Sequence, residues 1–417
     1  MAKRSARAPL RVAARRRLQN QRSSLMNTAW IRRICPAVVL VAILLGLTPA
    51  PAQDTGGKQS KGISAALQPF VDSGTLAGAV TLVADKDKVL CLEAVGYADV
   101  GAKSPMLVEM LFWIASMSKP ITGAGLMILV DEGKVNLDDP IEKYLPEFKG
   151  QWVITELGKD RVVLKKPARL VTVRDVMNHT SGLPGKSAME IPTYDVLSLK
   201  DAVRSYALTP LNSEPGTKYA YSNAGINVGG RIIEVVSGMS YEDFMSKRLF
   251  GPLGMKDTTF WPSEVQLKRL AKSYKPNKAK TGLEATTVTA LKYPLSDPKR
   301  QPFPGGGLFS TASDVGVFCQ MVMNGGEYKG KRYLSEAAVK TMTSKQTGDG
   351  VKTGYGVGWS TSGDTFGHGG AYATNMTIDS KRGLITVFMV QHSGGFPGNG
   401  GQSQAAFRKA AEQMYAK

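Results

Sequence analysis

The apolar segment from Ile121 to Val130 is the feature that most constrains the fold of this 417-residue chain. Pro120 stands where the first turn of a helix tolerates proline, and Glu132-Gly133 is typical of a helix end. The predicted helix is apolar on nearly every side, so other elements must cover it. We therefore expect this helix to be buried inside a large core.

The tetrad Ser116-Met117-Ser118-Lys119 stands at the head of this helix. Residues three apart lie on one face of a helix, so the Lys119 amine can reach the Ser116 hydroxyl and take its proton. A serine in the first turn also has a backbone N–H free to receive an oxyanion. Because a lysine near its usual pKa of about 10.4 is no base at neutral pH, the chemistry requires burial of the amine. Ser116 is the candidate nucleophile and Lys119 its base.

A second Ser-x-x-Lys tetrad, Ser296 to Lys299, shows that the pattern alone is weak evidence. Its central Pro298, with Pro294 and Pro302 nearby, predicts a loop that cannot hold the pair at helical spacing. An isolated tetrad of this kind is more often a surface lysine near a capping serine. The assignment of Ser116 therefore needs support from elsewhere in the chain.

Two further elements supply candidate partners. Tyr221-Ser222-Asn223 is the only Tyr-x-Asn in the chain and precedes a predicted helix. The Tyr221 phenol can protonate a leaving group, and the Asn223 amide can hold either a substrate carbonyl or the lysine. In His368-Gly369-Gly370, the glycines let a substrate lie against a strand edge. The N–H of Ala371 would then be the second oxyanion donor.

These elements, in this order, resemble the serine β-lactamase and penicillin-binding-protein superfamily, nearest to class C β-lactamases, family VIII carboxylesterases and D-aminopeptidase or DD-peptidase relatives. The resemblance spans roughly residues 62 to 417. The phrases that carry it are FWIASMSKPITG (112–123), MNHTSGLPG (177–185), EPGTKYAYSNAGINVGG (214–230), GPLGMKDTTF (251–260), GGGLFSTASDV (305–315) and GHGGAYAT (367–374).

The resemblance implies a role for each matching residue. Ser116 matches the family nucleophile, Lys119 its general-base partner and Tyr221 the second catalytic group. Asn223 matches the third residue of the tyrosine motif, and His368 the start of the Lys-Thr-Gly element. The implied mechanism is two-step acyl transfer, in which the Ser116 and Ala371 amides stabilise the oxyanion and water releases the acyl group.

His368 departs from the β-lactamase pattern, where a lysine places positive charge beside the catalytic tyrosine and the substrate carboxylate. An imidazole with its ordinary pKa near 6.5 is mostly neutral at pH 7 and supplies no such charge. The departure puts efficient β-lactam hydrolysis in doubt. His-Gly-Gly in this position is common in the esterase-like branches of the family.

Three classes of function remain open. The leading hypothesis is a serine hydrolase of ester or amide bonds. The nearest alternative is a DD-peptidase, D-aminopeptidase or true β-lactamase that acts on cell-wall peptides or lactams. The third is a non-catalytic binding or assembly protein on the same fold, which would have no need to keep Ser116, Lys119 and Tyr221.

No metal or other cofactor is predicted, because the chain has three histidines and no cysteine pair with zinc-site spacing. We expect His179 to be a structural residue at a helix end. His392 is assigned either to the glycine-rich loop that follows it or to the rim of the substrate site. No Gly-x-Ser-x-Gly elbow is present, which disfavours an α/β-hydrolase.

Residues 1–52 are typical of a secretory signal peptide. They contain ten Lys and Arg, no Asp or Glu, an apolar core from Ile34 to Leu47, and a small-x-small cleavage site before Gln53. The core is too short to span a bilayer comfortably, so the membrane is a partner only during export to the periplasm or the extracellular space. The start codon, Met1 or Met26, is left open.

Loss of this segment would lower the formal charge from +19 to +9, so much of the basicity belongs to the leader. No nucleic-acid motif accompanies the remaining charge, and no nucleic-acid partner is predicted. The predicted partner is a small-molecule ester, amide or lactam; the oligomeric state is open. For the two cysteines of the mature chain, Cys91 and Cys319, we expect buried thiols rather than a disulfide.

The predicted fold class is α/β, more closely α+β. The pattern at 78–95 predicts two strands joined by a turn at 85–87, and further strands are expected near 355–361, 365–378 and 383–391. These strands flank a middle where helical patterns dominate. This arrangement predicts one antiparallel sheet built from both chain ends and flanked by helices, with an inserted, mostly helical domain. After a flexible segment at 53–61, residues 62–417 would form the hydrolase domain, with 62–115 and 305–417 as its α/β part and 116–304 as its mostly helical part. The site should lie where the parts meet.

Overall fold

The computed structural model describes residues 62–416. The predicted signal peptide at 1–52 and the segment 53–61 lie outside these residues. The helices are α1 (Gln68–Asp72), α2 (Ser118–Asp131), α3 (Val173–Met177), α4 (Leu199–Ala207), α5 (Asn223–Ser237), α6 (Tyr241–Met245), α7 (Gly251–Leu253), α8 (Glu264–Leu267), α9 (Ala312–Met323), α10 (Glu336–Thr343) and α11 (Ser403–Tyr415).

The main sheet joins the two ends of the described chain. β1 and β2 form the predicted hairpin, whose turn is fixed by Asp85 Oδ1, the acceptor for the N–H groups of Asp87 (2.9 Å) and Lys88 (2.8 Å). β1 then pairs antiparallel with β15, with Val80 opposite Met389. The seven strands are ordered β12-β13-β14-β15-β1-β2-β3. They span β1 (Gly78–Ala84), β2 (Val89–Asp99), β3 (Ser104–Pro105), β12 (Ser360–Ser362), β13 (Thr365–Gly369), β14 (Asn375–Asp379) and β15 (Leu384–Met389).

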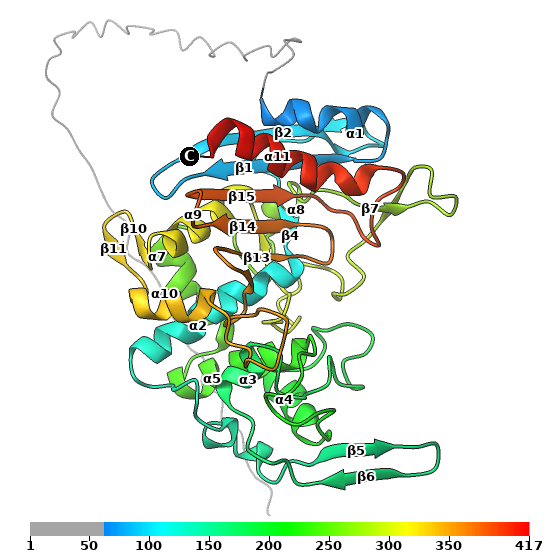
Figure 1. The fold of residues 1–417 in the computed structure, drawn as a ribbon. Coiled ribbons are helices and arrows are strands. Elements are labelled where there is room, and N and C mark those ends of the chain that lie inside the picture. Colours follow the sequence, from blue (N-terminus) through cyan, green and yellow to red (C-terminus); the bar gives the residue numbers. More distant parts are fainter. Residues whose placement is uncertain (1–61, 417) are drawn as a thin grey trace, which may run out of the picture. The chain divides into compact units, whose positions relative to one another are not determined.

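Helices cover both faces of this sheet, and β1 is buried along its whole length. Alternate side chains of β1 enter different cores: Val80 and Leu82 face the larger one, which contains α9, and Ala79 and Val83 the smaller one. The smaller core is closed by α1 and α11, which lie together on that face (Figure 1). The predicted fold class is confirmed.

α2 is the buried helix that the sequence predicts. Its residues from Ser118 to Leu129 are all buried, and Glu132 caps its C-terminal end. It packs against α5 and α10, and α5 in turn contacts α3, α4 and α6. Among residues 62–416, no helix is long and apolar enough to cross a membrane.

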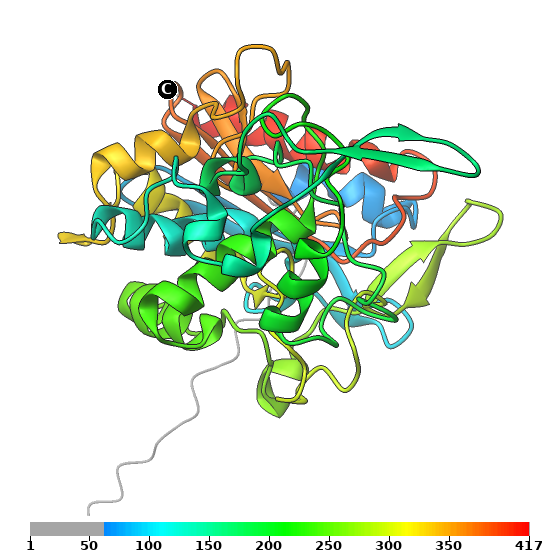
Figure 2. The ribbon, with the colours of Figure 1, turned by 90° about the horizontal axis from the view of Figure 1, so that it is seen from below.

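The middle of the chain contains more strands than the helical patterns indicated. Two hairpins interrupt it, β5 (Val153–Leu157) with β6 (Val162–Lys165), and β7 (Ser273–Pro276) with β8 (Leu283–Thr286). The β5–β6 hairpin extends away from the helices (Figure 2), and Leu157 near its tip is 75% exposed. Each hairpin also joins the rest of the structure at one strand, where the Ile154 N–H donates to the Leu211 carbonyl and the Tyr274 N–H to the Gln391 carbonyl, both at 2.8 Å.

Short strand pairs complete the structure. β4 (Phe112–Trp113) pairs with β9 (Phe309–Ser310), and β10 (Glu327–Tyr328) with β11 (Lys331–Arg332). The C-terminal strand predictions were too long: a turn at 370–374 divides the expected strand 365–378 into β13 and β14. The expected strand at 355–361 shrinks to β12 with an isolated bridge from Tyr355 to Ser360.

Cys91 and Cys319 are free thiols. Cys319 is buried, with Sγ 3.8 Å from Met376 Sδ. Cys91 is only half-buried, so the expectation of two buried thiols is wrong for it. Its place on β2 beside Tyr415 of the C-terminal helix leaves part of the side chain at the surface, and partial burial raises its pKa to about 11.

Candidate active site

Ser116 lies in a tight turn between β4 and α2. The turn is a 3-10 helix, η2 (Ala115–Met117), so the serine precedes α2 rather than standing in its first turn as expected. Ala115 has a φ of +46°, which side-chain-bearing residues rarely adopt. The Ser118 hydroxyl holds the turn by donating to the Ala115 carbonyl at 2.7 Å and accepting from the Leu308 N–H at 3.2 Å.

The Lys119 amine lies inside the protein beside Ser116. Its Nζ is 3.1 Å from Ser116 Oγ, 2.7 Å from Asn223 Oδ1 and 2.5 Å from the Gly305 carbonyl oxygen. The side chain is fully buried, and this desolvation holds the pKa of Lys119 well below its usual value. The predicted requirement for a buried lysine is met.

These contacts orient a neutral amine. The oxygens of Asn223 and Gly305 can only accept hydrogen bonds, so they take the two amine hydrogens. The remaining position around Nζ, its lone pair, then faces Ser116 Oγ. The geometry therefore suits removal of a proton from the serine hydroxyl.

Tyr221 and Asn223 flank the start of α5. Ser222 caps the helix, accepting from the Gly225 N–H at 3.1 Å and donating to the Pro184 carbonyl at 2.7 Å. The sequence allowed the Asn223 amide to hold either a substrate carbonyl or the lysine. In the structure its oxygen accepts from Lys119.

The Tyr221 ring lies over the lysine, with Lys119 Nζ 4.6 Å from the ring centroid. Desolvation raises the pKa of Tyr221 to about 12, against a hydrogen bond with Ser116 that lowers it. The phenol is therefore protonated at neutral pH and fits a proton donor. The residue is 43% exposed, so a substrate can reach it.

The turn after β13 brings Gly370 close to the segment that leads to Ser116. The Gly370 N–H donates to the Thr374 carbonyl at 2.7 Å. A Cβ on Gly370 would stand 2.6 Å from the carbonyl oxygen of Ile114, two residues before Ser116. Within residues 62–416, no backbone carbonyl accepts from the N–H of Ser116 or of Ala371. Both amides are free for an oxyanion, and this role stays a prediction.

His368 is placed differently from a substrate-binding residue. Its Nδ1 lies 2.7 Å from the Gly369 carbonyl and must carry the hydrogen there, so Nε2 accepts from the Tyr355 hydroxyl at 2.8 Å. Burial lowers the pKa of His368 to about 3, so the ring is neutral. Neither ring nitrogen is left for a substrate.

Three groups near Ser116 and Tyr221 were not predicted as site residues from the sequence. The Gly305 carbonyl and the Tyr355 hydroxyl are described above. The His179 ring lies 4.5 Å from the rings of both Tyr221 and Tyr355, and its Nδ1 accepts from the Ser222 N–H at 3.2 Å. His179 thus packs against Tyr221 and holds the residue after it, rather than only ending a helix.

Of the two alternatives for His392, the structure has the loop residue: it lies outside the helices and strands, at an isolated bridge with Tyr274. Its ring is buried, stacks on Phe396 with 4.4 Å between centroids, and accepts from the Ala77 N–H at 3.3 Å. Among residues 62–416, no group of three or more His, Cys, Asp or Glu side chains is placed to hold a metal.

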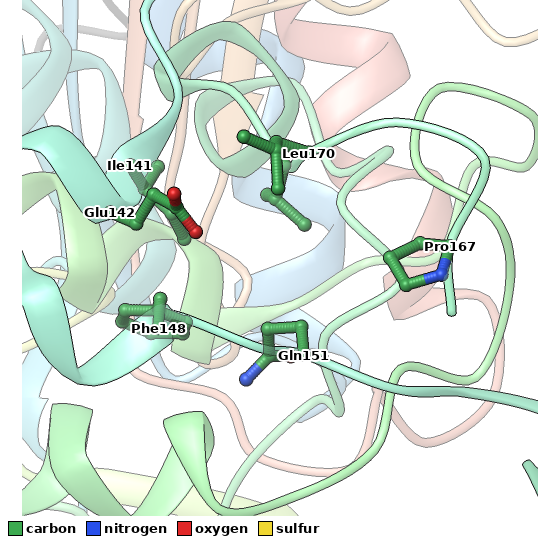
Figure 3. Close-up of a pocket in the computed structure, with 7 residues that line it drawn as sticks. Ile141, Glu142, Phe148, Gln151, Pro167 and Leu170 are labelled. Atoms are coloured by element: carbon green, nitrogen blue, oxygen red, sulfur yellow. The ribbon is translucent and has the colours of Figure 1, made fainter. Parts of the chain in front are cut away.

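A separate pocket lies in the helical part, between η3 (Ile141–Lys143), η4 (Pro146–Phe148) and the segment 167–171 (Figure 3). Its wall is largely apolar, with the polar side chains of Glu142 and Gln151 (Figure 3). None of the candidate catalytic residues lines it.

Known proteins share this sequence and fold. The Beta-lactamase family model matches residues 63–410. Protein Rv1367c of Mycobacterium tuberculosis is 31% identical over 369 residues, covering 79% of this chain and 90% of that protein.

Among solved structures, the hydrolase EstCE1, which has promiscuous acyltransferase activity, has a TM-score of 0.69 at 24% identity, with 84% of this chain and 97% of that one covered. The D-amino acid amidase of Ochrobactrum anthropi SV3 has a TM-score of 0.64 at 25% identity, with 84% and 98% covered.

The sheet, the inserted helices and the relatives define a serine hydrolase with the β-lactamase/DD-peptidase fold. The chain belongs to the Beta-lactamase family. The resemblance seen in the sequence is confirmed, and so is the assignment to the serine hydrolases. The roles of individual residues stay predictions.

Proposed function

We propose that this protein is an exported hydrolase that cleaves an ester or amide bond through an acyl-enzyme on Ser116. The observation that carries the proposal is the Lys119 amine, buried and 3.1 Å from Ser116 Oγ with both hydrogens engaged elsewhere. Burial holds the pKa of Lys119 well below its usual value, and desolvating an amine in this way costs the fold stability that a binding protein has no reason to give up.

In the proposed acylation step, Lys119 takes the Ser116 hydroxyl proton as Oγ forms a bond to the substrate carbonyl carbon. The N–H groups of Ser116 and Ala371 donate hydrogen bonds to the oxyanion. Collapse of the intermediate breaks the bond to the leaving group, which the Tyr221 phenol protonates. The Lys119 ammonium then returns its proton to Tyr221, and water repeats the sequence to release the acid.

The site favours uncharged substrates around the scissile bond. The His368 ring is neutral and both its nitrogens are engaged, so it supplies no cation for a substrate carboxylate. This supports short acyl esters or amides over lactams and acyl-D-Ala-D-Ala peptides. A D-amino amide is the second candidate, because the amidase of O. anthropi shares the fold at 25% identity.

Export is part of the proposal and rests on residues 1–52, with their ten basic residues, apolar core and small-x-small site. Amino-terminal sequencing of the secreted protein should begin at or near Gln53. A mature protein that keeps its basic leader would contradict export by this route.

Intact-mass spectrometry tests the catalytic proposal. The mature protein is incubated with a fluorophosphonate, a penicillin and p-nitrophenyl acetate. We expect one covalent adduct that is absent from Ser116→Ala. The matched control is Ser296→Ala in the second tetrad, whose hydroxyl only contacts Glu264 at 2.9 Å. This variant should label like the wild type.

The turnover of the adducts separates the substrate classes. Rapid release of acetate with a slow or absent penicilloyl adduct supports the esterase. Fast penicillin turnover would favour the lactam alternative. A folded wild type that no reagent labels would overturn the proposal and favour a binding protein.

A further inference from the structure

The Gly305 carbonyl that accepts from Lys119 belongs to a segment fixed from both sides. In the peptide group that joins Pro304 to Gly305, the Gly305 N–H donates to Asn227 Oδ1 at 3.2 Å. Its carbonyl, that of Pro304, accepts from Thr122 Oγ1 at 2.9 Å. α2 and α5 thus each provide one side chain that fixes the orientation of Gly305.

Asn227 is held in turn by two buried side chains. Its Nδ2 donates to the Tyr206 hydroxyl at 2.9 Å, and that hydroxyl donates to Glu190 Oε1 at 2.5 Å. The other carboxylate oxygen of Glu190 accepts from the Ser187 N–H at 2.7 Å. A continuous path of hydrogen bonds therefore runs from Glu190 to Gly305.

The donor and the acceptor are fixed for every hydrogen bond on this path. A carboxylate oxygen accepts, so the Tyr206 hydroxyl must donate to Glu190 and accept from Asn227. The Asn227 amide must then turn its NH₂ toward Tyr206 and its oxygen toward the Gly305 N–H. The carboxylate thereby sets the orientation of an amide two hydrogen bonds away.

The burial of this path is costly if it serves stability alone. Glu190 and Asn227 are 2% exposed and Tyr206 is fully buried. Desolvation raises the pKa of Glu190, the mark of a carboxyl in an unfavourable place. Apolar side chains of similar size would stabilise such a core at least as well.

The position of Asn227 connects the path to the lysine. Asn223 and Asn227 are four residues apart on α5 and lie on one face. Asn223 contacts Lys119 directly, and Asn227 contacts Gly305, whose carbonyl accepts the other amine hydrogen. Both acceptors that aim the Lys119 lone pair are therefore set from one helix face.

We propose that Glu190, Tyr206 and Asn227 are positioning residues that hold the Gly305 carbonyl against Lys119 and so aim its lone pair at Ser116. The inference rests on the proposed acyl-enzyme function. It assigns to three residues from 74 to 111 positions along the chain from Ser116 a role in the rate of acylation.

Tyr206→Phe tests the inference with the smallest change, since it removes one oxygen and keeps the ring in the core. The measurement is the rate of fluorophosphonate labelling of Ser116, by intact mass, on protein whose folded fraction is known from circular dichroism. We expect about a tenfold slower rate with the same final extent of labelling. Asn227→Ala removes the side-chain oxygen that accepts from the Gly305 N–H, and it should slow labelling at least as much.

Tyr144→Phe is the matched control. Tyr144 makes the same kind of bond, hydroxyl to carboxylate at 2.5 Å, with Asp139 and contacts no partner of Lys119. Its labelling rate should equal that of the wild type.

A double-mutant cycle separates positioning from general stability. If the path acts through the lysine, Tyr206→Phe should change the residual labelling rate of Lys119→Met by less than about twofold. The same tenfold loss in that background would overturn the inference, as would wild-type rates in folded Tyr206→Phe and Asn227→Ala. A wild type that is not labelled at Ser116 would instead overturn the proposed function, and this inference with it.

Discussion

At the residue scale, Lys119 carries a conflict between stability and chemistry. The unfolded chain exposes a lysine that is protonated at neutral pH, whereas burial in the folded protein favours the neutral amine. Folding therefore releases a proton between the two pKa values, and the free energy of unfolding rises with pH in that window.

We predict that the stability of wild type relative to Lys119→Met increases from pH 7 to pH 9. Because the folded pKa is depressed, deprotonation of the unfolded lysine at higher pH removes part of the folding cost. The slope approaches about 1.4 kcal/mol per pH unit above the folded pKa and ends near the ordinary value of 10.5. Urea unfolding of both proteins across this range measures it.

The same comparison with Lys143→Met is the control. Lys143 forms an exposed ion pair with Asp139 at 2.7 Å, and its pKa is raised rather than lowered. The stability of wild type relative to Lys143→Met should not increase with pH over this range. A flat difference for Lys119→Met as well would mean that the buried amine is still protonated in the folded state.

The sequence predicted the residues whose chemistry lies in the side chain: Ser116, Lys119, Tyr221 and Asn223 are all brought together. It could not predict Gly305, which acts through a carbonyl oxygen that every residue possesses. Gly305 is 186 residues from Lys119 along the chain, and only the tertiary fold brings its carbonyl to the amine. Local patterns carry no signal for such a contact.

At the element scale, the turn between β13 and β14 packs against the segment that leads to Ser116. Gly370 is packed so closely that a Cβ would meet Thr374 Oγ1 at 2.1 Å and the Ile114 carbonyl at 2.6 Å. The turn and the segment before Ser116 therefore approach each other closely, and a side chain between them would separate the two amides that we propose for the oxyanion.

We predict that Gly370→Ala lowers kcat/KM for p-nitrophenyl acetate by about 10²-fold or more, the scale of losing one oxyanion donor. The overpacked turn should also cost about 1–3 kcal/mol in urea unfolding. Gly401→Ala is the control, since a Cβ there has no atom within 4 Å. Normal turnover by Gly370→Ala would show that Ala371 is not an oxyanion donor.

The elements that the sequence missed are two short hairpins that are buried only where they join the rest of the structure, at Val153 and at Ser273 and Tyr274. β5 and β6 carry the strand-typical residues Val153, Ile154, Val162 and Val163 around a Gly158 turn, but helical patterns surround them in the chain. A self-paired hairpin shows neither the length nor the regular alternation of a sheet strand. The buried strand β1 and helix α2, by contrast, were predicted because burial imposes a pattern on every position.

At the scale of the whole molecule, all three histidines of the chain are buried and neutral. Desolvation lowers the pKa of His368 and His392 to about 3 and that of His179 well below its usual value. Each ring also accepts a hydrogen bond on one nitrogen, from Tyr355, Ala77 and Ser222 respectively. Protonation would break these bonds, so none of the three can take up a proton without local disruption.

We predict that the protein loses stability steeply between pH 6.5 and pH 5. The unfolded chain binds protons at its histidines below their ordinary pKa of 6.5, and the folded chain does not. Unfolding then takes up as many as three protons, and each histidine costs about 2 kcal/mol of stability at pH 5 relative to pH 7.5. Urea unfolding at pH 7.5, 6 and 5 measures the loss.

His392→Gln provides the matched comparison, because a glutamine oxygen can accept from the Ala77 N–H and does not titrate. Its loss between pH 7.5 and pH 5 should be smaller than that of wild type by the contribution of one histidine, about 2 kcal/mol. The raised pKa values of Glu190 and Asp314 act with the opposite sign, and they cancel when the two proteins are compared. Equal pH dependence in both proteins would mean that His392 is protonated in the folded state and that its burial is not what sets its charge.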